Sequence, residues 1–483
     1  MKICGNREFE LLKKIGFIRT AGSPEELKAA EILKEEVEAM GLTAEIVPFE
    51  IGDAVIEKAE LEVLEPYNKK YEVTAYKCCQ NCEDLVADFV YVENGNEVAL
   101  TDVKGKIVLV NGYMRVPLFK RLMKAGVAGF VTMSGTLLDK LDETDLFTRK
   151  IRDTLLHFGN APACNIRISD AFEMVTQKAS KVRMTVKNTP VTLTSHNVVC
   201  EVKGTKYPEE IVVLGGHYDS VPFSTGVFDN GAGSVVCMEV LRFLAENPPA
   251  RTVRVCWFGS EEIGLEGSKA YVEQHKDEMD KHVFMINCDV GGPVLGYDIC
   301  RVTGSKELTN FTDLGFKTQG LDCEVKQSIY SSDTIPFADA GVPGVNFSRE
   351  GTEGGAYIHC RDDIIDWLCP EALAKTTKHV LWFTDTLVNA PVFPEKREIP
   401  EEIKKDVDKY LYKKELAEVN IKPMIRSISF KVEEDALKIS ALLDSGSTSN
   451  LSPELVINTL IQCLEIDTDR SEVAVTRKEI IFE

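Results

Sequence analysis

The feature that most constrains the fold is a regular alternation of apolar and helical segments between residues 197 and 290. The apolar runs at 209–220, 252–259 and 282–290 have the length of buried strands, and helical spacing separates them. Strands that alternate with helices predict an α/β fold, a mostly parallel mixed sheet with helices on both faces. Ligands of such sheets gather at the carboxyl ends of the strands.

Changes in pattern divide the chain into four predicted domains. Residues 1–49 are expected to hold a helix from about Pro24 to Met40, stopped by Gly41, and a strand at 42–49, and they form the N-terminal part of the domain that carries the alternation. Residues 50–195 contain shorter strands around a helix and predict a small inserted α/β domain. Residues 196–391 carry the strand and helix alternation, and a charged, proline-punctuated connector opens an α+β appendage at 392–483, for which the sequence indicates no function.

Charge and composition exclude several classes of partner. The formal net charge is -21 and the pI is near 5.0, which argues against nucleic acid because phosphate neutralisation requires a basic face. The N-terminal residues lack a signal peptide pattern, and no run approaches the length of a membrane span. Cysteines scattered through apolar runs indicate reduced thiols. We therefore expect a cytoplasmic protein with no membrane partner, and a homo-oligomer stays open.

Polar residues follow the predicted strands, where side chains of neighbouring strands converge. His217 and Asp219 are two residues apart on an extended segment, so their side chains leave on the same face. Five more residues lie at strand ends, helix starts or loops: Asp229, Glu261, Glu262, Asp289 and His359. Two histidines and three carboxylates make a ligand set for two divalent ions and leave one carboxylate as a base. Sequence spacing alone does not decide which of the adjacent glutamates is the ligand.

This set of side chains is suited to metal-dependent hydrolysis. Imidazole and carboxylate ligands suit zinc, cobalt or manganese, and an aspartate between two cations can bridge them. Such a pair of ions lowers the pKa of a shared water, while a free glutamate takes its proton and returns it to a leaving amine.

Five motifs resemble those of the co-catalytic zinc aminopeptidase family, which includes glutamate carboxypeptidases and transferrin receptors. They are Gly216-His-Tyr-Asp-Ser, Phe228-Asp-Asn-Gly-Ala-Gly, Ser260-Glu-Glu-Ile-Gly-Leu-Glu-Gly-Ser, Asn287-Cys-Asp-Val-Gly-Gly and the late His359. The resemblance covers residues 10 to 390, and the insert resembles the protease-associated domain found in several peptidases.

The resemblance implies a role for each candidate residue. It implies two Zn²⁺ ions, one held by His217, Asp229 and Asp289, the other by Asp229, Glu262 and His359. Asp229 is then the bridge. Glu261 matches the general base, and Asp219 matches a supporting carboxylate beside the ligands.

Two departures from the family pattern fall on the side of the substrate. The family often has Ser-Asp-His where this chain has Ser332-Asp333-Thr334, and Tyr-His-Thr where it has Tyr357-Ile358-His359-Cys360. Asp333 and Tyr357 are the candidates for substrate contacts. Neither departure removes a metal ligand.

The sequence therefore predicts a metallo-aminopeptidase, a hydrolase that removes N-terminal residues from peptides with Glu261 as general base. One alternative is a carboxypeptidase or amidohydrolase that uses the same site. A second is a non-catalytic binding or scaffold protein in which the metals are structural. Preference for a side chain of the substrate does not follow from the sequence.

Overall fold

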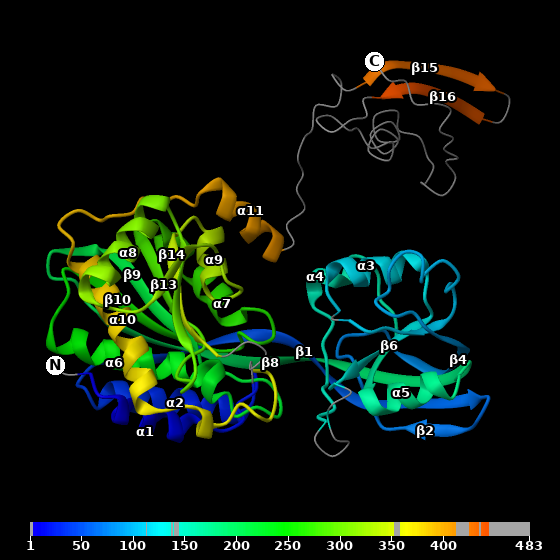
Figure 1. Ribbon diagram of the computed structural model, residues 1–483, viewed down its shortest axis with the longest axis horizontal. Coiled ribbons are helices and arrows are strands. Elements are labelled where there is room, and N and C mark those ends of the chain that lie inside the picture. The colour runs from blue at the N-terminus through cyan, green and yellow to red at the C-terminus, as the bar shows by residue number, and fades with distance from the viewer. Residues whose placement is uncertain are drawn as a thin grey trace. The chain divides into compact units, whose positions relative to one another are not determined.

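The computed structural model describes residues 3–112, 114–136, 139, 144–351, 358–411, 425–433 and 436–443 (Figure 1). Contacts divide the chain into two compact units, Met1–Lys413 and Lys414–Glu483. The described part of the second unit is one antiparallel pair, β15 (Ile425–Glu433) and β16 (Ala436–Leu443).

The main sheet of the first unit is mixed and mostly parallel. In spatial order its strands are β13 (Glu324–Gln327), β12 (Tyr297–Thr303), β14 (Gly344–Glu350), β11 (His282–Cys288), β9 (Tyr207–His217), β10 (Arg251–Phe258) and β8 (Lys181–Val202). The pairs β9–β10, β9–β11, β11–β14 and β12–β13 are parallel, whereas β12–β14 and β8–β10 are antiparallel. The predicted mixed α/β sheet is confirmed.

Helices cover both faces of this sheet, as the side chains of β9 show. Val212 and Leu214 pack into one apolar core, whereas Ile211 and Val213 pack into another on the opposite face. The first core includes side chains of α1 (Gly5–Ile15), α2 (Pro24–Glu38), α6 (Ala232–Glu246), α8 (Lys306–Gln319) and α10 (Pro370–Asn389). The second includes side chains of α7 (Glu266–Gln274), η2 (Lys276–Lys281) and α9 (Thr334–Asp339).

Helix α2 begins where the sequence predicts. The Ser23 hydroxyl accepts a hydrogen bond from the amide of Glu26 at 3.1 Å, and Pro24 occupies the first turn, where it has no amide to leave unpaired. The helix ends at Glu38, before the predicted stop at Gly41. Its packed face anchors the N-terminal residues to the main sheet.

A separate apolar core is formed by residues between 61 and 186. Its strands are β2 (Lys69–Tyr71), β3 (Val73–Ala75), β4 (Cys82–Tyr91), β5 (Ile107–Leu109), β6 (Gly129–Ser134) and β7 (Ala163–Arg167), with helices α3 (Val116–Ala125), α4 (Asp153–Leu156) and α5 (Ile168–Thr176). The strands β4 to β7 pair in parallel. We call this second α/β layer, residues 50–195, the insert.

One long antiparallel pair links the two cores. Strand β1 (Ala44–Glu65) pairs with β8 from Ala44–Cys200 to Glu65–Lys181, so the same two strands serve the main sheet and the insert (Figure 1). The strand predicted at 42–49 is therefore much longer in the structure, because its pairing with β8 continues past the main core. The insert is thus tied to the main sheet by a continuous ladder of hydrogen bonds.

The connector after the main sheet also packs on the first unit. Helix α11 (Glu401–Tyr410) places Ile403 and Val407 against Ile335 and Ala338 of α9. The boundary between the two compact units therefore falls at Lys413, whereas the appendage was predicted to begin at residue 392. The division into four domains stays a prediction. Among the described residues, no helix combines the length and apolar character needed to cross a bilayer.

Candidate metal centre and active site

Three parallel strand ends bring the predicted site residues together. His217 is the last residue of β9, and it pairs in register with Phe258, the last residue of β10. Glu261 and Glu262 follow β10, and Asp289 directly follows β11. Because β10 and β11 flank β9 in the same direction, their carboxyl ends meet at one edge of the sheet. His217 and Asp289 are buried there, and the side chains of Glu261 and Glu262 are 13% and 6% exposed.

The first group of candidate ligands is His217, Asp229 and Asp289. The Nε2 atom of His217 lies 3.1 Å from Oδ1 of Asp229 and 3.5 Å from Oδ1 of Asp289. Asp229 reaches this point from η1 (Val227–Gly231), an irregular turn that leads into α6. The geometry is that of one imidazole and two carboxylates converging on a common point.

The second group is Asp229, Glu262 and His359. The Nε2 atom of His359 lies 3.1 Å from Oδ2 of Asp229 and 3.0 Å from Oε2 of Glu262. Asp229 therefore faces one histidine with each carboxylate oxygen. That arrangement matches the bridging role that the family resemblance implies, and both groups have the donor types that zinc prefers.

A third combination, His217, Glu261 and Glu262, also has ligand spacing. Oε2 of Glu261 is 4.0 Å from Nε2 of His217. Geometry alone thus places both glutamates beside the two groups of candidate ligands. The assignment of Glu261 as base and Glu262 as ligand stays a prediction.

The charge balance of the site calls for cations. Burial and the neighbouring Asp229 raise the pKa of Glu262 to about 7. Burial raises the pKa of Glu261 well above its usual range, although His217 opposes the shift. Burial lowers the pKa of His359, but hydrogen bonds to Asp229 and Glu262 outweigh it and raise the value to about 11. Neighbouring buried carboxylates are difficult to ionise together, and divalent ions would supply the positive charge that stabilises their ionised form.

Two buried polar atoms are left without a hydrogen-bond partner in this cluster. They are Oε1 of Glu262 and Nδ1 of His217. The Nδ1 atom lies 3.3 Å from Oδ1 of Asp219. An unpaired carboxylate oxygen pointing into an acidic cluster fits a ligand atom whose partner is a cation. The residues present therefore fit a pair of divalent ions.

Asp219 has a second function that the sequence did not reveal. Its Oδ1 accepts a hydrogen bond from the amide of Glu261 at 2.9 Å, and its Oδ2 accepts one from the amide of Glu262 at 3.2 Å. One buried carboxylate thus holds the backbone of both adjacent glutamates. Ser260, just before them, has a positive φ of 56°, and its amide donates to Glu26. The turn is held from both sides.

The turn that carries Asp229 is likewise held by residues far away in sequence. Asp363 accepts from the amides of Phe228 and Asp229 at 2.8 and 3.1 Å. Asn230 accepts from the amide of Val290 at 3.1 Å and donates to the carbonyl of Cys288 at 2.8 Å. These bonds tie the bridging aspartate to the strand end that bears Asp289.

The buried guanidinium of Arg19 donates hydrogen bonds to backbone carbonyls next to the same turns. Arg19 is fully buried and donates to carbonyl oxygens on both sides of the site, those of Phe17, Tyr218, Thr225 and Gly226. Burial lowers its pKa to about 10, while Asp219 and Asp363 act in the opposite direction. No motif singles out Arg19, because its partners are backbone atoms and all but Phe17 lie about two hundred positions away.

Of the two predicted substrate contacts, the structure describes only Asp333. Asp333 is fully buried before α9, and neither carboxylate oxygen has a hydrogen-bond partner. Burial raises its pKa to about 7, with His217 opposing. Tyr357 lies outside the described residues. Burial raises the pKa of Tyr330, and the charges of Asp289 and Asp229 add to this rise.

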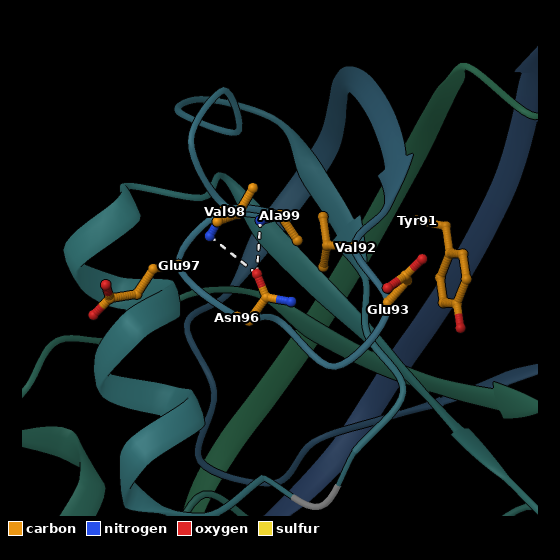
Figure 2. A pocket seen from close by; sticks show the side chains of 7 residues that line it. All are labelled: Tyr91, Val92, Glu93, Asn96, Glu97, Val98 and Ala99. Carbon is orange, nitrogen blue, oxygen red and sulfur yellow. Dashed lines mark hydrogen bonds between the residues drawn. The ribbon is translucent and has the colours of Figure 1, made fainter.

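A separate hollow lies in the insert and is lined by residues 91–93 and 96–99 (Figure 2). Its acidic side chains, Glu93 and Glu97, belong to no metal-ligand group among the described residues. Asn96 is used locally, since its side chain accepts from the amides of Val98 and Ala99 at 3.0 Å. The hollow carries none of the chemistry at the strand ends.

Part of the chain is similar to known peptidases. Residues 197–384 match Peptidase family M28. The chain is 30% identical to Aminopeptidase YwaD of Bacillus subtilis over 259 residues, which are 51% of this chain and 54% of the relative. It is 35% identical to Carboxypeptidase Q of Rattus norvegicus over 227 residues, 44% of this chain and 46% of the relative. The chain thus spans about half the length of these relatives.

Solved structures show the same fold. BSAP, a zinc aminopeptidase from Bacillus subtilis, superposes with a TM-score of 0.66 at 23% identity, covering 83% of this chain and 99% of that one. An aminopeptidase from Aneurinibacillus sp. strain AM-1 gives a TM-score of 0.64 at 23% identity, with 83% and 96% covered. At this identity the likeness concerns the fold alone.

Proposed function

We propose that this chain is a metal-dependent aminopeptidase that removes N-terminal residues from peptides, because residues 197–384 match Peptidase family M28. The observation that carries the proposal is Asp229, which faces His217 with one oxygen and His359 with the other while Glu261 stays beside the pair. The similarity to aminopeptidase YwaD supports the same activity.

Two divalent ions, with Zn²⁺ preferred, fit the two ligand groups that share Asp229. We assign His217, Asp229 and Asp289 to one ion and Asp229, Glu262 and His359 to the other. When bound, such ions supply Lewis-acid activation of water and of the scissile carbonyl. Zinc is favoured by the histidine and carboxylate donors.

Glu261 moves the proton in this proposal. Its carboxylate takes a proton from the attacking water and returns it to the leaving amine. Asp219 fixes the backbone of Glu261 through its amide, which keeps the base aimed at the site. Asp333, buried with no hydrogen-bond partner, and Tyr357 remain the proposed substrate contacts.

A peptide panel tests the activity directly. Matched peptides with a free amino terminus, an acetylated amino terminus and an amidated carboxyl terminus are incubated with the metal-loaded protein and with Glu261→Gln. We expect cleavage of the free and amidated peptides one residue at a time from the amino terminus, and none of the acetylated peptide. Cleavage that is indifferent to acetylation would contradict the aminopeptidase assignment.

The same panel separates the second candidate, a carboxypeptidase or amidohydrolase. The similarity to Carboxypeptidase Q favours it as the alternative. That enzyme class would tolerate the acetylated peptide. A scaffold protein with structural metals would cleave no member of the panel.

Further proposals concern the rest of the chain. We propose that residues 50–195 act as a protease-associated type of insert, because they form a separate α/β core within the chain. We propose a cytoplasmic location, since the cysteines of the described residues are all free thiols. The strongly negative charge supports the absence of a nucleic-acid partner.

A further inference from the structure

His359 is the candidate ligand with the least support from regular structure. Its side chain is 54% exposed, whereas that of Glu262 in the same group is 6% exposed. It lies in a turn between β14 and η3 (Ile365–Trp367), and its φ of 60° is a left-handed conformation. Such a ligand depends on other contacts to hold its imidazole in place.

Two residues that follow His359 in the chain hold the turn. Asp363 accepts hydrogen bonds from the amides of Phe228 and Asp229, inside the main domain. Nearer to the histidine, Arg361 donates to both carboxylate oxygens of Asp145, with Nε 3.0 Å from Oδ2 and Nη2 on Oδ1. Asp145 belongs to the insert, so this ion pair crosses from the insert to the loop that carries His359.

The segment that presents Asp145 is itself firmly held in the insert. The carbonyl of Phe147 accepts from Asn165 at 2.9 Å, and the amide of Phe147 donates to Ser134. The Phe147 ring also packs edge-on against Phe223 of the main domain, with the ring centres 5.4 Å apart. The carboxylate of Asp145 is only 6% exposed. It is a fixed partner for Arg361, unlike the carboxylate of a mobile surface chain.

We propose that the Asp145–Arg361 ion pair positions His359, so that the insert completes the second metal site. A two-point arginine–carboxylate pair fixes both the distance and the orientation of its partners. Because the Arg361 side chain is 44% exposed, the pair contributes little to the stability of the fold. Its effect is instead on the ligand loop, because residues that orient metal ligands typically change metal affinity by about 10- to 100-fold.

The inference rests on the two-metal site proposed above. It assigns to the insert a specific task in the chemistry of that site, which is to hold one ligand of one of the two ions. The His217 group has no contact of this kind with the insert among the described hydrogen bonds and ion pairs, so it serves as an internal reference.

Metal titration of the full-length, metal-free protein tests this. Zn²⁺ binding is followed by calorimetry for the wild type, Asp145→Ala, Arg361→Ala and the double variant, and His359→Ala identifies which binding step belongs to the second site. We expect that step alone to weaken by about 10- to 100-fold in both single variants. The double variant should lose no more than either single variant, because the two side chains act as one unit.

Asp53→Ala is the matched control. Asp53 is a similarly buried carboxylate of the insert, 10% exposed, and pairs with Lys77, which has no hydrogen bond or ion pair with the described residues 358–363. This variant should bind both ions as the wild type does. Unchanged second-site affinity in Asp145→Ala, equal weakening of both sites, or the same loss in Asp53→Ala would overturn the inference. Failure of the wild type to bind any ion would instead refute the proposed function.

Discussion

Replacing Asp219 by asparagine separates the placement of the catalytic glutamate from the binding of metal. Each oxygen of Asp219 accepts one amide, that of Glu261 at 2.9 Å and that of Glu262 at 3.2 Å. Asparagine has a single acceptor oxygen, so one amide would face an NH₂ group instead. The side chain is fully buried, and water cannot fill the missing bond.

The expected magnitude follows from that lost bond. A hydrogen bond to a charged group contributes about 1.5–3 kcal/mol, and the turn that carries Glu261 must shift to relieve the unpaired donor. Displacement of a catalytic group by about 1 Å costs roughly 100-fold in rate. We therefore expect Asp219→Asn to lower kcat by about 100-fold, or about 2.7 kcal/mol in the activation barrier, while both ions stay bound.

The assay measures kcat and KM on a free-amine peptide together with zinc content. Asp298→Asn is the control, because Asp298 is equally buried and also bonded through both oxygens, to Arg349 and Thr376, which belong to neither ligand group. It should lose stability without a selective loss of kcat. If Asp219→Asn kept full metal content and a kcat within threefold of the wild type, the positioning role of Asp219 would be refuted.

Three more predictions concern metal and pH. Asn230→Ala removes the link between the bridging turn and the Asp289 strand end, so zinc affinity of the His217 group should fall by about 10-fold or more in calorimetric titration, and unchanged affinity would count against the link. Chelation should abolish hydrolysis and lower the thermal midpoint, with both restored by Zn²⁺; activity that survives chelation would contradict metal dependence. Burial raises the pKa of Glu8 to about 8, although Thr377 opposes the shift, so the folded state holds a proton that the unfolded state loses above about pH 4.5. The free energy of unfolding should therefore fall as pH rises from about 4.5 to 8, by up to about 1.4 kcal/mol per pH unit. In Glu8→Gln the thermal midpoint should depend less on pH over that range. An identical slope of the midpoint against pH in both proteins would refute the shift.

Much of the main sheet was predictable because its signal is local. The alternation of apolar runs and helical segments gives strand and helix identity, and β9, β10 and β11 fall where the sequence places them to within a few residues. Parallel pairing then brings their carboxyl ends together, which explains why His217 and Asp289 could be grouped in advance. The length of β1 was not predictable, because it depends on continued pairing with β8 in the insert.

The supports of the site carry no such signal. Arg19 bonds to backbone carbonyls, Asp363 accepts backbone amides, and Arg361 meets a carboxylate more than two hundred positions earlier. Every residue has backbone groups that can form hydrogen bonds, so the contacts of Arg19 and Asp363 leave no motif in the sequence. The partner of Arg361 is a side chain, but it lies too far away in the chain for sequence spacing to indicate the pair.

Metal content and turnover, measured side by side in the wild type and in Glu261→Gln, test the central claim most directly. Elemental analysis should find two Zn²⁺ ions per chain in both proteins, and only the wild type should hydrolyse a free-amine peptide. Loss of an ion in Glu261→Gln would make Glu261 a ligand, as the group of His217, Glu261 and Glu262 allows. Retained turnover in that variant would remove Glu261 from the mechanism.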